Sequence, residues 1–159
     1  METLSHKYYV SLEVSKLLKE AGFDWEIDTF YQRYYEGDGH DNSIPTEEFV
    51  LHNTDYAHCS NWNNTSLTHI NGILHRLSAP TLDVAQRWLR EVKNIQIIAS
   101  PLSGSKKWTP LIAKDFWLLH EDISGIALTS ENFDTYELAL ESGIKKALEI
   151  ILEKGEQEL

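Results

Sequence analysis

Five of the seven histidines and the only cysteine lie within residues 40–75, and these residue types bind metals or carry out nucleophilic chemistry. They are His40, His52, His58, Cys59, His69 and His75. Structural zinc sites supply their ligands in tight pairs such as C-x2-C, whereas the intervals here are irregular. We therefore interpret the cluster as chance clustering in polar loops and predict no metal ligand. The weak candidates for a zinc site are His52, His58, Cys59 and His69.

Cysteine catalysis needs a base within hydrogen-bond reach and a third group that orients the base. The adjacency of His58 and Cys59 does not provide this arrangement, so we predict that Cys59 is a partly buried, inert thiol. The sequence also has no G-x-S-x-G, P-loop, G-x-G-x-x-G or H-E-x-x-H pattern. We therefore expect a non-catalytic protein without a cofactor, and an enzyme without short motifs is the alternative.

Charge is distributed unevenly along the chain, whose net charge is −11. Residues 61–110 hold six Lys or Arg and two acidic residues, while the segments on either side are strongly acidic. An acidic protein is poorly suited to general nucleic-acid binding, which depends on neutralising phosphates. We interpret Arg87, Arg90 and Lys93 as a solvated helix face, with a nucleic-acid surface as the less favoured hypothesis.

Acidic and aromatic surfaces are the features that favour a partner. Carboxylates gather in "DWEID", "EGDGHD" and "HEDIS", and such fields steer association with a cationic protein. Aromatic residues crowd the first 35 positions, and exposed aromatic rows are common in protein interfaces. The predicted binding residues are Asp38, His40 and Asp41 in a glycine-rich turn, with Arg87 and Arg90.

The bulk composition predicts the cellular compartment and the number of domains. The N-terminus has no apolar segment after a basic start, and no run approaches the length of a spanning helix. A single cysteine excludes an intramolecular disulfide, which suits a reducing compartment. We expect a cytoplasmic protein without membrane contact, folded as one domain over residues 1–159. The sequence predicts neither the identity of a partner nor the oligomeric state.

Apolar residues at helical spacing predict three helices. The first begins at Ser11 and closes at Gly22. The second is capped by Thr81 and ends at Lys93 and Asn94; its apolar stripe is Ala85, Trp88, Leu89 and Val92, while Gln86, Arg87, Arg90 and Glu91 face away. The third is capped by Asp134, with Glu137 completing a capping box and Phe133 packing on Leu138. Its apolar face is Leu140, Ile144, Ala147, Leu148 and Ile151.

Short apolar runs between turn signals predict the strands. We expect strands in residues 24–39, in "FVLH", on both sides of an Asn71-Gly72 turn, in "IQIIA", in "WTPLIAKDFWLLH" and in "GIALT", with long loops over residues 38–66. "PLSGSKKW" has the composition of a hairpin loop. Together these elements predict an α+β fold, with helices packed on one face of a mainly antiparallel sheet.

Three phrases in the helical regions resemble a group of small proteins encoded by phages, prophages and other mobile elements of gut bacteria. They are "LLKEAGFD" (17–24), "SAPTLDVAQRWLREVKNIQI" (78–97) and "TYELALESGIKKALEIIL" (135–152), and they cover about a third of the chain. Residues 38–75 depart from the pattern, since they are longer and more polar. The group has no established activity, so the resemblance implies a mobile-element context and no site residue.

The preferred hypothesis is a non-catalytic phage or prophage accessory protein that binds another protein through an acidic or aromatic surface. The alternative is a small hydrolase or metal-dependent enzyme that uses the His-bearing region 40–75. The third hypothesis is a nucleic-acid-binding module that uses the basic segment 76–107.

Overall fold

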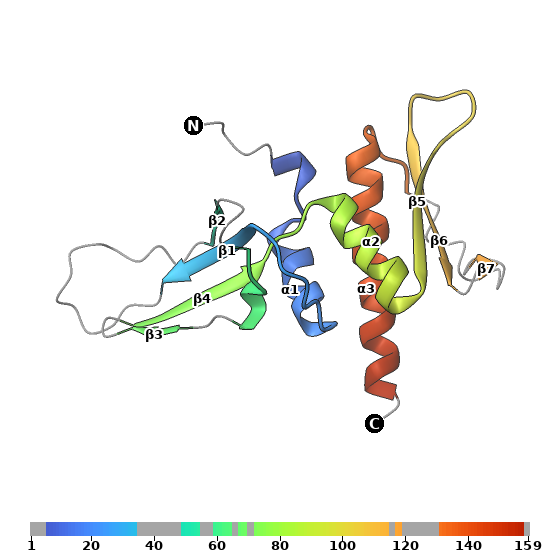
Figure 1. Ribbon diagram of the computed structural model, residues 1–159. Coiled ribbons are helices and arrows are strands. Elements are labelled where there is room, and N and C mark those ends of the chain that lie inside the picture. Colours follow the sequence, from blue (N-terminus) through green and yellow to red (C-terminus); the bar gives the residue numbers. More distant parts are fainter. Residues whose placement is uncertain are drawn as a thin grey trace. The chain divides into compact units, whose positions relative to one another are not determined.

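Two antiparallel sheets and three α-helices make up the part of the chain that the structure describes. The computed structural model describes residues 6–34, 49–54, 59–64, 67–69, 72–114, 117–118 and 131–157. Within them, one sheet has the strand order β2-β1-β4-β3 and the other has the order β5-β6-β7 (Figure 1). The predicted α+β class is confirmed, and the strands are antiparallel as expected. They divide between two sheets instead of forming one.

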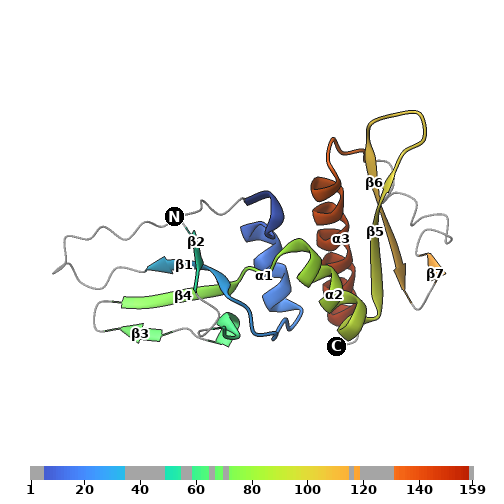
Figure 2. The ribbon, with the colours of Figure 1, turned by 45° about the horizontal axis from the view of Figure 1, so that its top comes forward.

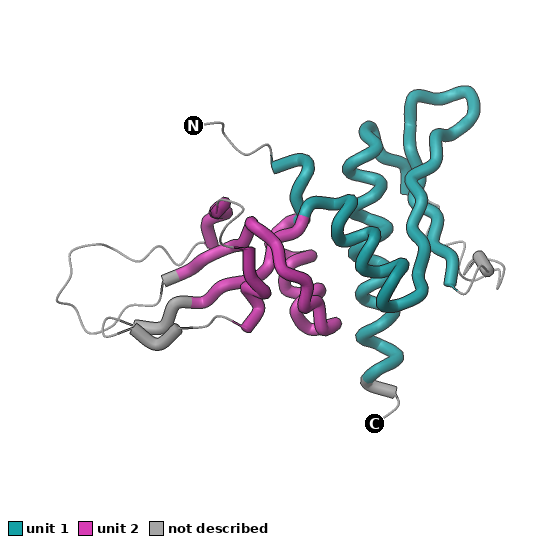
Figure 3. Tube along the Cα trace, viewed as in Figure 1, with its two compact units in different colours: residues 1–10, 81–159 teal, residues 11–80 magenta. Residues whose placement is uncertain are grey.

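The chain separates into two compact units, which are coloured in Figure 3. Unit 1 comprises residues 1–10 and 81–159, and unit 2 comprises residues 11–80. Each unit contains one of the two sheets. The expectation of a single domain over residues 1–159 stays a prediction.

In unit 1, α2 (Leu82–Lys93) and β5 (Ile95–Pro101) follow each other with a single residue between them. Asn94 takes the left-handed conformation, with φ of 59°, which ends the helix and turns the chain directly into the strand. Trp88 and Leu89 are fully buried, as the helical spacing predicted. Val92 is 51% exposed, so its placement on the buried stripe was wrong; it lies in the last turn, where the chain leaves for β5.

The long helix α3 (Tyr136–Gln157) begins one residue later than predicted. Thr135 Oγ1 accepts a hydrogen bond from the Leu138 N–H at 3.2 Å, so Thr135 provides the cap instead of Asp134. With the cap moved by one residue, Phe133 and Leu138 no longer occupy the positions of a hydrophobic staple. The buried face of the helix is confirmed at Leu140, Ile144, Ala147 and Leu148, whereas Ile151 is only half-buried.

Helix α3 lies along the strands β5 and β6 (Trp108–Lys114), as Figures 1 and 2 both show, and α2 also packs on β5 and α3. The helix comes close to both strands at Gly143. A Cβ atom at that position would meet Ile97 Cγ2 at 2.7 Å and Pro110 Cβ at 3.0 Å. Glycine is therefore required here by the neighbouring strand surface, because any larger side chain would push the helix off the sheet.

The strand β6 contains a proline at position 110 without loss of sheet hydrogen bonds to β5. The backbone of Trp108 is hydrogen-bonded to Phe133, at 2.8 Å in both directions, and so faces away from β5. Backbone groups alternate along a strand, so the nitrogen of Pro110 also faces away from β5. β7 (Trp117–Leu118) pairs antiparallel with β6, and the predicted hairpin loop joins β5 to β6.

The carbonyl of Ile97 lies on the side of β5 that faces away from β6. Gln86 Nε2 of α2 donates a hydrogen bond to it at 2.6 Å, and Gln96 Nε2 donates a second at 3.3 Å. Gln86 therefore points toward β5, which corrects the prediction that it faces away. Within the described residues, β5 is at the end of its sheet.

In unit 2, α1 (Leu12–Glu20) packs against one face of the four-stranded sheet, chiefly at β4. Ser11 accepts a hydrogen bond from the Val14 N–H at 3.3 Å, and Gly22, with φ of 92°, follows the end of the helix, as predicted. Leu12 packs against the buried Tyr31 and Leu77 on that face.

The central strands of this sheet are β1 (Thr29–Tyr34) and β4 (Gly72–Ser78), with β2 (Val50–Asn53) and β3 (Leu67–His69) outside them. The strands expected at "FVLH" and around Asn71-Gly72 are therefore confirmed. His69 pairs with Gly72, so Gly72 begins β4 and does not belong to the turn. The glycine-rich turn with Asp38, His40 and Asp41 and the "GIALT" segment lie outside the described residues.

A polar latch, formed by Trp62 and Asn63 in the short helix η3 (Trp62–Asn64), holds unit 2 together. Asn63 Nδ2 donates to the Phe23 carbonyl and Asn63 Oδ1 accepts from the Ser78 N–H, each at 2.9 Å. Trp62 Nε1 donates to the Ile27 carbonyl at 2.7 Å. All three bonds are buried, so a segment expected to be a loop ties the chain after α1 to the end of β4.

Candidate functional site

His52 is the predicted metal candidate whose surroundings are best defined, and it belongs to an aromatic stack. Its ring stacks on Phe30, with 5.6 Å between centroids and 19° between planes, and Phe30 packs on Trp62 at 4.2 Å. We call Trp62, Phe30 and His52 the aromatic stack. Burial and, secondly, the nearby charge of Arg76 lower the pKa of His52, which favours its neutral form.

The strand register explains how the stack forms. Phe30 pairs with His52 of β2, and Gln32 pairs with Arg76 of β4, which places these four side chains on one face of the sheet. This is the face opposite the one that α1 covers. Phe30 is 6% exposed and Trp62 is 7% exposed, while His52 at the end of the stack is half-buried.

Arg76 lies beside the same rings. Its guanidinium carbon is 5.2 Å from the centroids of both Phe30 and Trp62, and its Nε donates a hydrogen bond to Gln32 Oε1 at 3.0 Å. A guanidinium has five N–H donors, and this hydrogen bond uses one of them. Among the residues that the structure describes, no Asp or Glu forms an ion pair with Arg76.

The histidine cluster does not assemble into a metal centre in the described ranges, where no three His, Cys, Asp or Glu side chains are placed to hold an ion. His40 and His58 lie outside those ranges, and His69 is in β3. Cys59 is exposed, which corrects the prediction of a partly buried thiol. Among the four weak zinc candidates, His52 instead has a packing role, because its ring stacks on Phe30.

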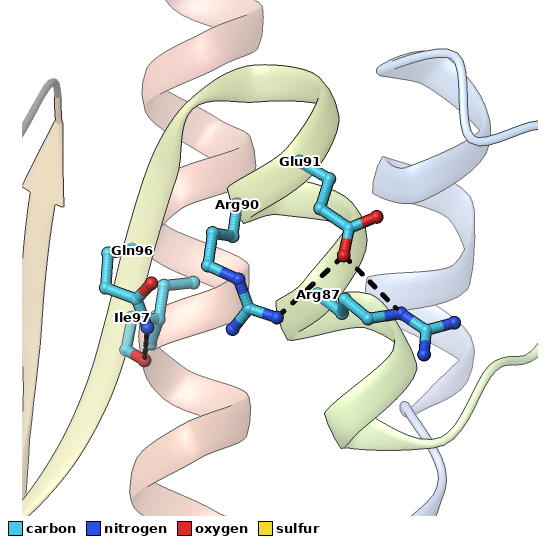
Figure 4. A network of polar contacts seen from close by, with 5 residues as sticks. All are labelled: Arg87, Arg90, Glu91, Gln96 and Ile97. Carbon is cyan, nitrogen blue, oxygen red and sulfur yellow. Dashed lines mark hydrogen bonds and ion pairs between the residues drawn. The ribbon is translucent and has the colours of Figure 1, made fainter.

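Arg87 and Arg90 lie on the exposed side of α2, as predicted, and both reach the same carboxylate (Figure 4). Arg87 Nε is 3.9 Å from Glu91 Oε1, and Arg90 Nη2 is 4.0 Å from the same atom. All three side chains are about half exposed. One acidic residue therefore partly neutralises the pair, which reduces the positive field that a phosphate backbone would meet.

Three aromatic residues from the short helix η1 (His6–Tyr8), β6 and the start of α3 form what we call the tyrosine surface: Tyr8, Trp108 and Tyr136. Tyr8 is 49% exposed and Tyr136 is 41% exposed. Trp108 meets Tyr136 edge to face, with 5.4 Å between centroids. Contacts join η1 to α3, and the pKa of Lys7 is raised chiefly by Tyr8 and in part by Glu137.

Charged groups surround the tyrosine surface. Lys7 Nζ lies 4.6 Å from the centroid of the Tyr8 ring, and Lys107 forms an ion pair with Asp134. Glu131 is exposed and Glu137 is half-buried. The surface thus combines aromatic faces that accept a cation with carboxylates that attract one.

The aromatic stack and the position of Arg76 beside it were not predicted from the sequence. Trp62 lies between two asparagines in a polar segment. A large aromatic residue in such a segment indicates that its ring packs against another part of the chain. Arg76 was grouped with the basic segment 76–107 because of its place in the chain. Its guanidinium instead lies against Phe30 and Trp62 of unit 2.

Comparison with known proteins gives no relative: no protein-family model, curated protein or solved structure matches the chain. In the described part of the chain, no helix is both long enough and apolar enough to cross a membrane.

Proposed function

We propose that this chain is a non-catalytic accessory protein that binds a basic segment of another protein through the tyrosine surface. The exposure of Tyr8 in η1 and of Tyr136 at the start of α3 is the observation that carries the proposal. Tyrosine is enriched at interfaces because it offers a large rigid apolar area with a polar end, at a low cost in conformational entropy. The phage or prophage context is part of the same proposal and rests on the resemblance alone.

The chemistry of the partner follows from charge and from one internal contact. The chain carries a net charge of −11, which attracts cationic proteins over the screening distance of the solvent. Lys7 already lies over the face of Tyr8, and a lysine or arginine of a partner would use Tyr136 in the same way. Glu131 and Glu137 would pair with further cations of the segment.

Capture of host proteins on the tagged chain, followed by mass spectrometry, would identify the partner, and synthetic peptides from its basic segments would then be titrated onto the purified chain. We expect Tyr8→Ala and Tyr136→Ala each to weaken peptide binding by about tenfold, in the range of interface hot spots. Ile98→Ala is the matched control, because Ile98 is 45% exposed in the same unit and lies away from the tyrosine surface on β5.

Binding should also weaken as salt is raised, since the attraction is partly electrostatic. Circular dichroism of each variant would verify that it folds. Peptide binding that is unchanged in both tyrosine variants, or that is lost equally in Ile98→Ala, would contradict the proposal.

A further inference from the structure

Within the described residues, the face of the unit 2 sheet that carries the aromatic stack is only partly covered. On this face η3 covers Phe30 and the neighbouring Ser78, through the contact of Trp62 with Phe30 and the hydrogen bond from the Ser78 N–H to Asn63. Toward β2, no contact of this kind is found among the described residues. Val50 is 48% exposed, and it pairs with Gln32 and lies two residues from His52 on the same side of its strand. We call Val50, His52 and Arg76 the open corner.

Arg76 contributes a positive charge that the described residues leave without a counter-ion. Its guanidinium is half-buried against two rings that are each less than 8% exposed, so part of its hydration is lost. A partly desolvated cation is costly unless an anion or several acceptors compensate it, and here Gln32 supplies a single acceptor. An oxyanion with two oxygens would engage the remaining donors in the bidentate manner that guanidinium groups favour.

His52 contributes a flat ring at the end of a stack. Trp62 and Phe30 hold the imidazole from one side, and the ring is half-buried, so it remains in contact with solvent. Its neutral form is favoured, and a neutral ring accepts another flat ring without a charge penalty. Bases of nucleotides stack on aromatic and histidine side chains in this manner.

We propose that the open corner binds a nucleoside phosphate, whose base stacks on His52 and whose phosphate pairs with Arg76. His52 of β2 and Arg76 of β4 both contact Phe30 of β1, so the ligand would span that ring. Val50 provides an apolar border for the base. This site is in unit 2 and is independent of the tyrosine surface in unit 1, so either proposal can fail without the other.

Titration of the full chain with a nucleoside monophosphate, with the matching nucleoside and with inorganic phosphate would test the site. We expect the monophosphate to bind more tightly than either part alone. Arg76→Gln should reduce its affinity by at least about tenfold, because the charge-assisted pairing is lost. His52→Val should bring its affinity down to that of inorganic phosphate. Arg33→Gln is the matched control, since Arg33 lies on the opposite face of the same sheet, against Phe49.

A spectroscopic readout separates binding at this corner from binding elsewhere. In the free chain Arg76 contributes to the lowered pKa of His52, and a phosphate on Arg76 would offset that contribution. The imidazole resonances of His52 should therefore titrate at higher pH when the monophosphate is present. Equal affinity for the monophosphate and inorganic phosphate, no effect of either variant, or an unchanged His52 titration would overturn the proposal.

Discussion

The two units bury different kinds of side chain. In unit 1 the buried surface of α2, α3, β5 and β6 is almost entirely aliphatic, with Trp88 as its largest member. In unit 2 the core includes buried polar side chains. Of the six such residues in the described part of the chain, five belong to unit 2, and they are Ser15, Thr29, Gln32, Asn63 and Ser78.

The difference shows two ways of specifying a fold. Aliphatic packing follows from the spacing of apolar residues and tolerates substitutions of similar volume. Among the described residues, the hydroxyls of Ser15 and Ser78 are buried without a hydrogen-bond partner. Most buried polar groups are hydrogen-bonded, because an unmade bond costs the full desolvation of the group. Unit 2 is therefore defined by a few directed bonds, such as the 2.6 Å bond from Thr29 Oγ1 to the Ala79 carbonyl.

The largest expected effect is in the aliphatic core. Trp88→Ala should lower the free energy of unfolding by about 3 to 5 kcal/mol, because the ring is fully buried and leaves a cavity. Urea denaturation measures the loss, and hydrogen exchange shows whether it is confined to the amides of unit 1. Val92→Ala in the same helix is the control, with an expected change within about 0.5 kcal/mol. A similar loss in both variants would contradict the placement of the buried stripe.

The next effect tests the polar latch of unit 2. Asn63→Ala leaves the Phe23 carbonyl and the Ser78 N–H without their partner, which should cost about 2 to 3 kcal/mol. The neighbouring Asn64→Ala removes an exposed side chain of the same type and should be close to neutral. Equilibrium unfolding measures the stability of the two variants. If they are equally stable, the hydrogen bonds of the polar latch do not stabilise unit 2.

A pair of glycines in α3 gives effects of opposite sign. Gly143→Ala should destabilise by about 1 to 2 kcal/mol, since the new methyl group collides with Ile97 and Pro110 and this outweighs the gain in helix propensity. Gly155→Ala meets no atom within 4 Å and should stabilise by up to about 1 kcal/mol. Thermal unfolding would compare them. Stabilisation by both substitutions would show that α3 does not approach β5 as closely as described.

The smallest expected effect is a dependence of folding stability on pH, caused by His52 in unit 2. The pKa of His52 is lowered in the folded chain, so below the unfolded value of about 6.5 the unfolded chain takes up a proton more readily than the folded chain. Stability should therefore fall as the pH drops through this value, and the loss should level off below the folded pKa. His52→Phe keeps a stacked ring and removes the titration. Urea midpoints that vary with pH equally in both proteins would exclude His52 as the cause.

The elements of unit 1 could be predicted largely because their apolar residues recur at helical or strand spacing. The cap of α3 was misplaced by one residue because Asp134 and Thr135 are both good N-cap residues, and the contact with Lys107 takes Asp134 away from the helix. The burial of Trp88 could be predicted from the helical spacing, whereas the exposure of Val92 depends on where the neighbouring elements end.

The contacts of unit 2 could not be predicted in the same way, because they join residues far apart in the chain. Asn63 is 40 residues from Phe23 and 15 from Ser78. The aromatic stack likewise needs the register of β1 with β2 before Phe30 and His52 can be seen as neighbours. Of the predicted binding residues, Arg87 and Arg90 are where they were expected. Asp38, His40 and Asp41 lie outside the described residues, so their role stays a prediction.

The two glutamine bonds to the Ile97 carbonyl change what the outer side of β5 offers to another chain. A strand at the end of a sheet offers its free backbone groups to any passing chain, and this is the usual start of aggregation. In β5 the amides of Gln86 and Gln96 occupy that carbonyl, so an incoming strand must displace them before it can add to the sheet. We expect these two uncharged side chains to make pairing of copies through this strand less favourable, beside the exposed Ile98.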